Sequence, residues 1–427
     1  MRKGFLFDHE LCVACKACSA ACMLENDWIF KARNIFTLRD KDKSGERIIN
    51  LSMACNHCSE AACLQGCPSK AFYRDPVSSA IIIDPGKCIG CRYCLWNCPY
   101  EAPVYNDEKG IIEKCHLCNH RITEGDEPAC SSACPTGALS FGNIPENINH
   151  NPYPWMPEKN LNPALKLDSP ASTTGLRQVP SQMMRPGMAL AGNFKTLTGH
   201  WILVLFTFVL TVAVSLNISA SAGYPLFTRD VVPALLAVAG MISVFHISRM
   251  SLAWTSVLNF AASPLSREIA AFLLFVSLII LDRILDTSLT HIAAIIAGLV
   301  LLVLVDQVYN YSDPSPGTVF HSGQTFLTSL IITSYLLESY VPFLFIAGVK
   351  CVMSISILWS RKNRDRMFAA RYMRLGFLLV AAMMVITRPD NSRYTGIAIL
   401  LAGEFLDRIL YYMDFKPDNI KNKISNQ

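Results

Sequence analysis

The sequence predicts a chain of two parts, an α+β domain rich in cysteine followed by an all-α bundle of eight helices. Two observations predict this division. All but one of the 17 cysteines fall between Cys12 and Cys134, in a region of mixed polarity. From Trp201 onward, long apolar segments alternate with short polar breaks, which is typical of helices that cross a bilayer.

Changes in composition place the boundaries of these parts. We predict a cysteine-rich domain over 1–142, a linker rich in Pro and Asn over 143–193, a helical membrane bundle over 194–415 and a basic tail over 416–427. The net charge is only +5, and no basic stripe is interleaved with aromatic residues. The sequence therefore predicts no nucleic-acid partner.

The sixteen N-terminal cysteines form four groups of four with closely related spacing. The groups are Cys12, Cys15, Cys18 and Cys22; Cys55, Cys58, Cys63 and Cys67; Cys88, Cys91, Cys94 and Cys98; and Cys115, Cys118, Cys130 and Cys134. Three closely spaced thiolates can wrap one iron–sulfur cubane, while the fourth ligates the other cluster of a pair. Zinc would need only two CxxC pairs per ion. We therefore predict four 4Fe–4S clusters in a double ferredoxin-like domain.

The order of the groups suggests how they pair. Groups 2 and 3 are closer in sequence and groups 1 and 4 are the ends, so we expect a nested arrangement. In this hypothesis the four ligand sets are Cys12, Cys15 and Cys18 with Cys134; Cys115, Cys118 and Cys130 with Cys22; Cys55, Cys58 and Cys63 with Cys98; and Cys88, Cys91 and Cys94 with Cys67.

Eight segments in the second half are candidates to span a membrane. They are 201–221, 231–249, 268–286, 291–311, 319–337, 341–359, 371–388 and 394–413. About 20 apolar residues are needed to cross hydrocarbon roughly 30 Å thick. Soluble helices have a polar face, whereas residues 292–305 have none, so the pattern favours a lipid bilayer as the environment.

The cysteine-rich part resembles a known family. The segments GFLFDHELCVACKACSAAC, LSMACNHC, CIGCRYCLWNCPYEAPVYN and KCHLCNHR are similar to the iron–sulfur subunit of dimethyl sulfoxide reductase and its relatives, over nearly all of residues 4–142. One departure is Ala14, where the family usually has Gly. The resemblance implies electron transfer to a separate catalytic subunit that holds a molybdopterin cofactor.

The second half resembles the anchor subunit of the same family, in residues 243–272, 306–311 and 403–415. That subunit is an eight-helix bundle that oxidises menaquinol to menaquinone and holds no haem, so none is expected here. In the family the two subunits are separate polypeptides, whereas here they are fused.

Three residues are candidates for the quinol site. His246 and Arg249 are predicted to act in catalysis, and Glu268 is predicted to bind the quinol with them. Quinol oxidation releases two protons, and His is suited to accept one because its unperturbed pKa is about 6.5. An ionisable group at membrane depth is costly and therefore a functional candidate. The alternatives are a helix-end role for His246 and a buried pair of Glu268 with Arg267. For Asp306 and Lys350 we expect pairing within the bundle.

Loop charges predict the orientation in a bacterial plasma membrane. Thirteen Lys or Arg residues fall on the side of the N-terminus and four on the opposite side, which favours a cytoplasmic cysteine-rich domain. The family resemblance instead implies the periplasmic face. Two alternative functions remain: a quinone-reducing anchor of a dehydrogenase such as formate dehydrogenase, and an ion-translocating or scaffold subunit.

Overall fold

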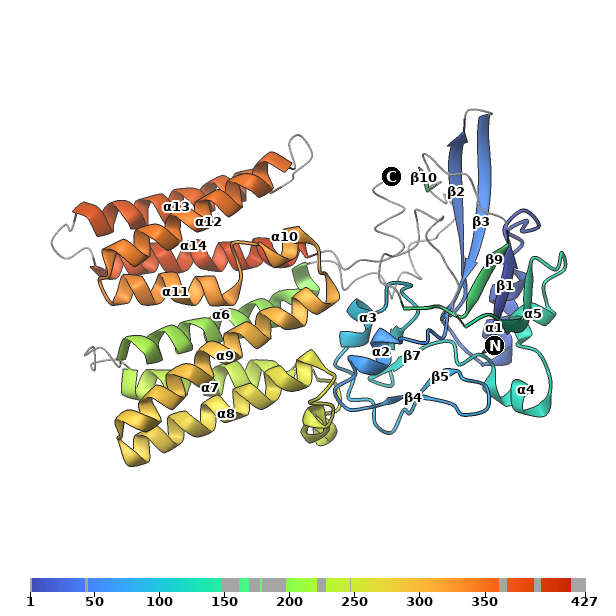
Figure 1. Ribbon diagram of the computed structural model, residues 1–427, viewed down its shortest axis with the longest axis horizontal. Helices are drawn as coiled ribbons and strands as arrows, with labels where there is room; N and C mark the ends of the chain where they lie inside the picture. The colour runs from blue at the N-terminus through green and yellow to red at the C-terminus, as the bar shows by residue number, and fades with distance from the viewer. Residues whose placement is uncertain are drawn as a thin grey trace. The chain divides into compact units, whose positions relative to one another are not determined.

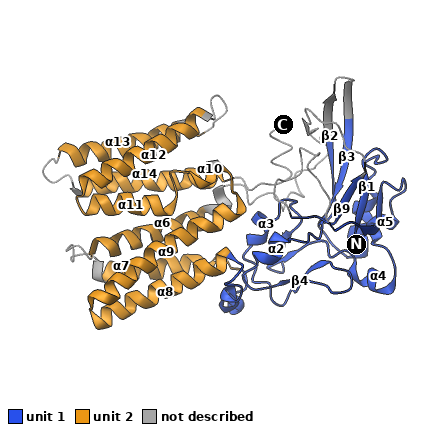
Figure 2. Cartoon of the chain, in the orientation of Figure 1, with its two compact units in different colours: residues 1–191, 248–263, 417–427 blue, residues 192–247, 264–416 orange. Residues whose placement is uncertain are grey.

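The computed structural model describes residues 2–42, 45–146, 161–168, 177–178, 197–220, 228–245, 247–360, 367–387 and 393–415. The protein divides into two compact units, coloured blue and orange in Figure 2. Unit 1 comprises 1–191, 248–263 and 417–427, and unit 2 comprises 192–247 and 264–416. Residues 248–263, which lie between two helices of the bundle in sequence, thus belong to the cysteine-rich unit.

A three-stranded sheet in unit 1 brings together strands that are far apart in sequence (Figure 1). Strand β1 (Arg2–Asp8) lies between antiparallel β8 (Leu139–Ile144) and parallel β9 (Leu165–Asp168). Leu165 pairs with Phe5, and both side chains are buried. Part of the range that the sequence predicts as a linker therefore completes this sheet, because its apolar side chains reach the core.

Short elements carry the cysteine loops. The remaining strands of unit 1 are β2 (Asn34–Asp42), β3 (Gly45–Met53) and β10 (Arg177–Gln178) in one sheet, and the hairpins β4 (Phe72–Arg74) with β5 (Ile81–Ile83) and β6 (Val104–Asn106) with β7 (Ile111–Glu113). Its helices are α1 (Ala17–Glu25), α2 (Ala62–Gln65), α3 (Tyr93–Asn97), α4 (Asn119–Glu124) and α5 (Ala129–Ser132). Each helix contains or directly follows a cysteine of one motif, so the predicted α+β class holds for this unit.

Left-handed backbone turns shape the cysteine loops. Residues Lys16, Arg92 and Cys118 have φ of 65°, 62° and 47° and immediately precede α1, α3 and α4. Between the first two cysteines of motif 3, Gly90 has φ of 71°. Ala14 holds the same place in motif 1 with φ of 54°, a conformation that is costly for a residue with a Cβ.

Unit 2 is mostly helical. Its helices are α6 (Leu197–Ala220), α7 (Thr228–Phe245), α8 (Pro264–Leu285), α9 (Ser288–Ser312), α10 (Pro316–Val319), α11 (Thr325–Leu336), α12 (Tyr340–Ser360), α13 (Phe368–Thr387) and α14 (Arg393–Asp414). Each predicted span overlaps one of these helices, although α11 begins at Thr325, later than predicted. Four described helices are long and apolar enough to cross a membrane, or five if α7 and the short helix after it form one broken span. Unit 2 therefore associates the protein with a membrane.

Candidate functional site

The cysteines of unit 1 gather into four sets, in which thiols from different motifs act on one another electrostatically. Site A contains Cys67, Cys88, Cys91 and Cys94. Site B contains Cys55, Cys58, Cys63 and Cys98. Site C contains Cys22, Cys115, Cys118 and Cys130. Site D contains Cys12, Cys15, Cys18 and Cys134. These are the sets that the nested hypothesis proposes.

Contacts between sets give their order along unit 1. Cys94 in site A lies within electrostatic range of Cys63 in site B. Cys115 in site C lies within such range of Cys55 in site B, and Cys22 in site C lies within such range of Cys18 in site D. The four sites therefore follow one another as A, B, C and D.

The thiols are suited to hold a multinuclear iron cluster. Burial raises the pKa of Cys22, Cys91 and Cys98 to about 12, so a bound cation is needed to favour their thiolate forms at neutral pH. The four cysteines of site C line one cavity. The four thiols around this cavity match the number of ligands that one cubane takes.

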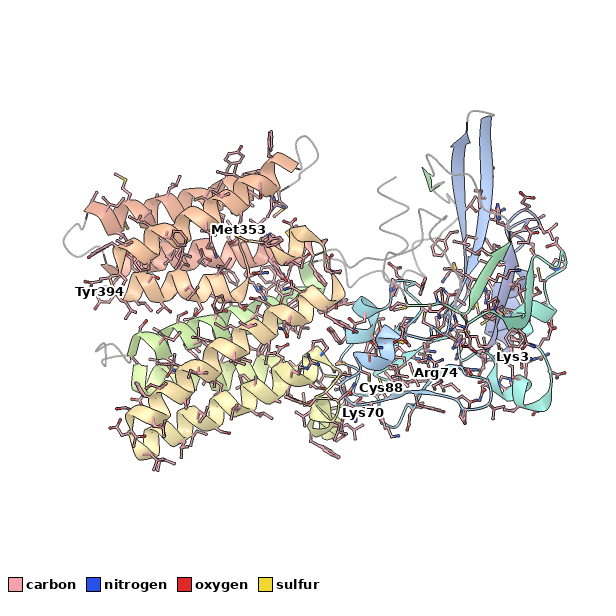
Figure 3. The ribbon with its side chains drawn as sticks, in the orientation of Figure 1. Lys3, Lys70, Arg74, Cys88, Met353 and Tyr394 are labelled. Carbon is pink, nitrogen blue, oxygen red and sulfur yellow. The ribbon has the colours of Figure 1, made fainter. Side chains whose placement is uncertain are left out.

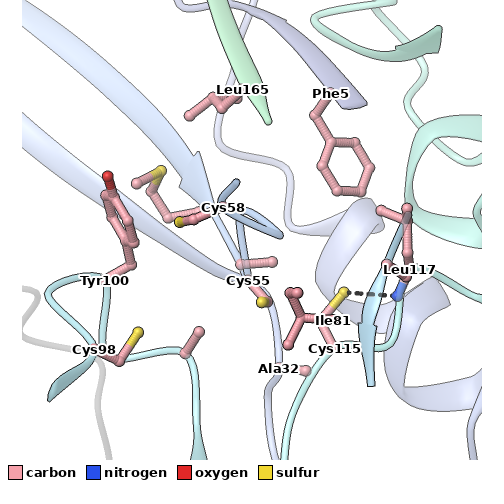
Figure 4. Close-up of a cluster of buried hydrophobic side chains, with 14 of the residues drawn as sticks. Phe5, Ala32, Cys55, Cys58, Ile81, Cys98, Tyr100, Cys115, Leu117 and Leu165 are labelled. Atoms are coloured by element: carbon pink, nitrogen blue, oxygen red, sulfur yellow. Dashed lines mark hydrogen bonds between the residues drawn. The ribbon is translucent and has the colours of Figure 1, made fainter. Parts of the chain in front are cut away.

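Hydrogen-bond donors point at the sulfur atoms. The backbone N–H groups of Ala71, Leu117 and Leu139 lie 3.3, 3.4 and 3.4 Å from the Sγ atoms of Cys67, Cys115 and Cys134. The bond from Leu117 to Cys115 is drawn in Figure 4. Such donors stabilise negative charge on cluster sulfur and raise reduction potentials, so the loops are built to hold anionic sulfur.

His57 adds a donor to site C. Its Nδ1 accepts the N–H of Ile81 at 3.0 Å, so Nε2 carries the proton and lies 3.7 Å from the Sγ of Cys115. Burial, together with the nearby charge of Lys114, lowers the pKa of His57 well below its usual value. The ring is therefore neutral, and its tautomer is fixed by the strand β5.

Residues 248–263 dock on the loops of site A. At one end of this segment, which contains the 3₁₀ helix η2 (Met250–Val257), the guanidinium of Arg249 donates to the carbonyls of Pro85 and Cys88. The Ser248 hydroxyl lies 2.6 Å from that of Tyr105. Cys88 is labelled in Figure 3. This end of the segment therefore holds the first cysteine loop of motif 3.

The other end of the segment holds the end of motif 2. The side-chain amide of Asn259 donates to the carbonyls of Gln65 and Cys67 at 2.8 and 2.9 Å. Its backbone N–H donates to Pro68, and the Ser263 hydroxyl donates to Gly66 at 2.8 Å. Both loops that supply thiols to site A are thus bound by the segment that follows α7 and precedes α8. No sequence motif marks this role, since Asn259 lies in a stretch of mainly small and apolar residues.

The three predicted quinol residues have different outcomes. His246 lies outside the described residues. Arg249 hydrogen-bonds the cysteine loop, and its positive charge acts on Cys88. Glu268 is buried near the start of α8, within electrostatic range of Arg408 and Asp306. The structure thus places Arg249 in unit 1 and Glu268 in unit 2.

Glu268 belongs to a buried polar cluster in unit 2 that also contains Arg408 and Asp306. Arg408 on α14 donates from Nε to Thr207 and from Nη1 to the carbonyl of Gly323, each at 2.9 Å. Its guanidinium lies 4.6 Å from the ring centre of Tyr411. Among the described residues, Arg408 Nη2 and Tyr411 Oη are buried without a hydrogen-bond partner. Such donors are costly unless an acceptor binds them.

A second buried network joins α12 and α13 to α14. Lys350 Nζ lies 2.5 Å from Glu404 and 3.6 Å from Asp407, and Arg374 lies 2.8 Å from Asp407. The predicted pairing of Lys350 within the bundle is confirmed. Asp306 accepts the N–H of Thr325 at 3.0 Å, at the start of α11. These contacts satisfy the buried charges and favour a structural role that locks the helices together.

Comparison with known proteins agrees with this geometry. Residues 47–144 match a family described as the 4Fe-4S dicluster domain. The protein is 39% identical to the probable anaerobic dimethyl sulfoxide reductase subunit YnfG of Escherichia coli K12, and 38% identical to the B subunit of the anaerobic dimethyl sulfoxide reductase of that strain. Each of these matches covers 34% of this protein and 74% of the relative. The thiosulfate reductase electron transfer subunit PhsB of Salmonella typhi is 34% identical, over 33% of this protein and 76% of its own length.

Proposed function

Because the protein belongs, through its cysteine-rich part, to the family of iron–sulfur subunits of anaerobic dimethyl sulfoxide reductase, we propose that it carries electrons from a membrane quinol to a separate catalytic subunit. Unit 1 is the electron conductor, and unit 2 is the anchor that oxidises the quinol. By resemblance to the family, the quinol is menaquinol and the partner holds a molybdopterin cofactor.

The four cysteine sites are proposed to hold one 4Fe–4S cluster each. Thiolate-bound clusters accept and release single electrons. The protein supplies four thiols per site and N–H donors toward sulfur, of which the bond from Leu117 to Cys115 is one example. The order of the sites makes a continuous path from A to D.

Electrons are proposed to enter at site A, and one observation supports this assignment. The segment 248–263, which continues directly into α8, binds both loops that supply thiols to site A. Asn259 and Arg249 do so through the carbonyls of Cys67 and Cys88. The part of the polypeptide that leads into the anchor is therefore held at this site by hydrogen bonds.

Electrons are proposed to leave at site D. Cys15 is exposed, and Cys12 and Cys134 are half-buried. The neighbouring side chains of Leu11 and Val13 are 48% and 65% exposed. An apolar surface beside an exposed redox site favours docking of another protein, and we assign it to the catalytic subunit.

The quinol head group is proposed to bind near Glu268, with His246 and Arg249 as further candidates. A quinol oxygen can accept a hydrogen bond from Arg408 Nη2 or Tyr411 Oη, the two buried donors without a partner among the described residues of this cluster. Glu268 can accept a proton, since two protons leave with each pair of electrons. One proton would then move from a quinol oxygen to a carboxylate oxygen of Glu268 and the second would leave to water, while the two electrons pass one at a time to site A.

Purification without oxygen tests the whole assignment. We expect about sixteen iron atoms per polypeptide, since each 4Fe–4S cluster brings four, together with cluster signals in electron paramagnetic resonance after reduction. A menaquinol analogue should reduce these clusters, and co-purification should recover a molybdenum-containing subunit. A protein that contains few iron atoms when isolated anaerobically contradicts the proposal, and a partner that oxidises formate or hydrogen would reverse the direction of electron flow.

The Glu268→Gln variant tests the quinol site. Gln keeps the size of the side chain and cannot take a proton, so we expect at least roughly tenfold slower reduction of the clusters by quinol and unchanged reduction by dithionite. The matched control is Glu338→Gln, outside this cluster. Equal quinol rates in the Glu268 variant and the wild type would remove Glu268 from the site.

Loop charges lead us to propose that unit 1 faces the cytoplasm. Protease treatment of sealed right-side-out cells tests this, with cleavage expected only after the membrane is opened. Cleavage between residues 150 and 180 in intact cells would place unit 1 on the outer face.

A further inference from the structure

Two cations are buried between the cysteine sites of unit 1. Arg33 is 2% exposed and Lys114 is 4% exposed. Such residues are seldom fully buried unless an opposite charge is near them. Neither is a cysteine-site ligand, and neither forms an ion pair with a carboxylate in the described part of the protein. The thiolate sites themselves are therefore the candidates for their counter-charge.

Arg33 lies between sites C and D. Its charge acts on Cys22, Cys115 and Cys130 of site C, and on Cys18 of site D. Its Nη1 donates to the Ser52 hydroxyl at 3.2 Å, and that hydroxyl lies 3.5 Å from the Sγ of Cys18. Arg33 is thus connected to both sites.

The guanidinium of Arg33 also has unused donors. Among the described residues, its Nε and Nη2 atoms are buried without a hydrogen-bond partner. The side chain lines the same cavity as the four cysteines of site C. The ring of Phe5 lies 4.4 Å from the guanidinium carbon and closes off water on that side. An anionic group in the cavity would satisfy these donors.

Lys114 lies between sites B and C. Its Nζ donates to the carbonyl of Ile81 and, at 2.9 Å, to that of Cys115. Its charge acts on Cys55 and Cys63 of site B and on Cys115 of site C. Site C is therefore the one site that both buried cations reach, whereas site B is reached by Lys114 and site D by Arg33.

Given the proposed cluster-bearing function, we propose that Arg33 and Lys114 raise the reduction potential of site C above the potentials of sites B and D. A reduced cluster carries one more negative charge than an oxidised one. A fixed positive charge in a buried environment therefore stabilises the reduced form. Site C gains from two fully buried charges and site D from one. Site B gains from Lys114 and from the half-buried Arg2, which acts on Cys58 and whose charge water screens more strongly. Electrons on the path would reside preferentially at site C.

Redox titration of the full-length protein with its clusters, followed by electron paramagnetic resonance, tests this assignment. In Arg33→Gln we expect the ratio of reduced to oxidised cluster at site C to fall about tenfold at a fixed potential, which is about 59 mV for a one-electron couple. Site D should shift in the same direction. In Lys114→Gln, sites C and B should shift, and site A should stay unchanged in both variants.

The exposed Lys109 provides a matched control, since Lys109→Gln removes the same charge from a side chain that binds Glu113 at the surface. Arg33→Lys keeps the charge, so the potential of site C in this variant should stay close to that of the wild type. Shifts below about twofold at site C, against the roughly tenfold expected, in variants with wild-type iron content would overturn the proposal, as would equal shifts at site A.

The unmodified protein gives a test that does not depend on the folding of a charge variant. The signal lost in Cys118→Ser identifies site C, and its potential in the wild type should exceed those of sites B and D. A lower potential would refute the inference. Absence of iron from the wild type would instead contradict the proposed function, so the two failures are distinct.

Discussion

Asn259→Ala removes the side chain that binds the end of motif 2. Its amide donates to two backbone carbonyls, those of Gln65 and Cys67, and Asn259 is only 9% exposed. Each lost hydrogen bond leaves a carbonyl that must find water, at a cost of about 1–1.5 kcal/mol. The docked state of residues 248–263 should therefore lose about 2–3 kcal/mol, and its open population should rise about 30- to 150-fold.

Amide hydrogen exchange measures this opening directly. The N–H groups of residues 65–67 and 69–71 should exchange faster in the variant by that factor. Menaquinol should reduce the clusters more slowly, while dithionite reduces them normally. Asn34→Ala is the control, because its amide binds only the carbonyl of Lys31 at an exposed edge. Exchange within about threefold of the wild type at residues 65–67 and 69–71 would refute the reasoning that these bonds hold the segment in place.

The other predictions concern the cysteine loops. Cys98→Ser should change the resonance signal of the site B cluster, and a change confined to site A would contradict the nested ligand sets. Ala14→Gly should raise the free energy of unfolding by about 1 kcal/mol, because glycine adopts a left-handed backbone without strain. Gly90→Ala should lower the free energy of unfolding, because a Cβ would lie 2.4 Å from the Gly110 carbonyl oxygen. Thermal unfolding measures both effects. In the protein without its clusters, burial raises the folded-state pKa of thiols such as Cys22 to about 12. Above about pH 9 the unfolded state therefore holds fewer protons than the folded state. The free energy of unfolding should fall between about pH 9 and 12. Urea titration at several pH values tests this, and a free energy of unfolding that does not change between about pH 9 and 12 would contradict it.

The sequence predicts the broad fold well because local patterns dominate it. Apolar runs indicated a helix at each of eight places in unit 2. The strand β9 (Leu165–Asp168) was not predicted, because it pairs with the distant strand β1 and lies within a stretch rich in turn-forming residues. Pairing at such sequence separation leaves little trace in local composition.

The candidate site was predictable where chemistry fixes spacing. Cysteine ligands must be close in sequence to wrap one cluster, so their positions identify the loops. The docking role of Asn259 was not predictable, because a single amide that binds backbone carbonyls needs no motif. Arg33 was missed for a related reason. It lies outside a recognisable pattern, and only the fold brings it to the cysteines.

The nested cysteine sets have a consequence for how the protein is made. Every thiol of sites A and B lies at or before Cys98, so both can be complete while the ribosome is still translating the rest of unit 1. Sites C and D must wait for Cys130 and Cys134. The hydrogen bonds from Asn259 to the loops of site A can form only after α7 has been synthesised, because Asn259 follows α7 in sequence. Clusters can therefore be inserted into sites A and B before sites C and D, and the docking of residues 248–263 on site A can coincide with insertion of the helices into the bilayer.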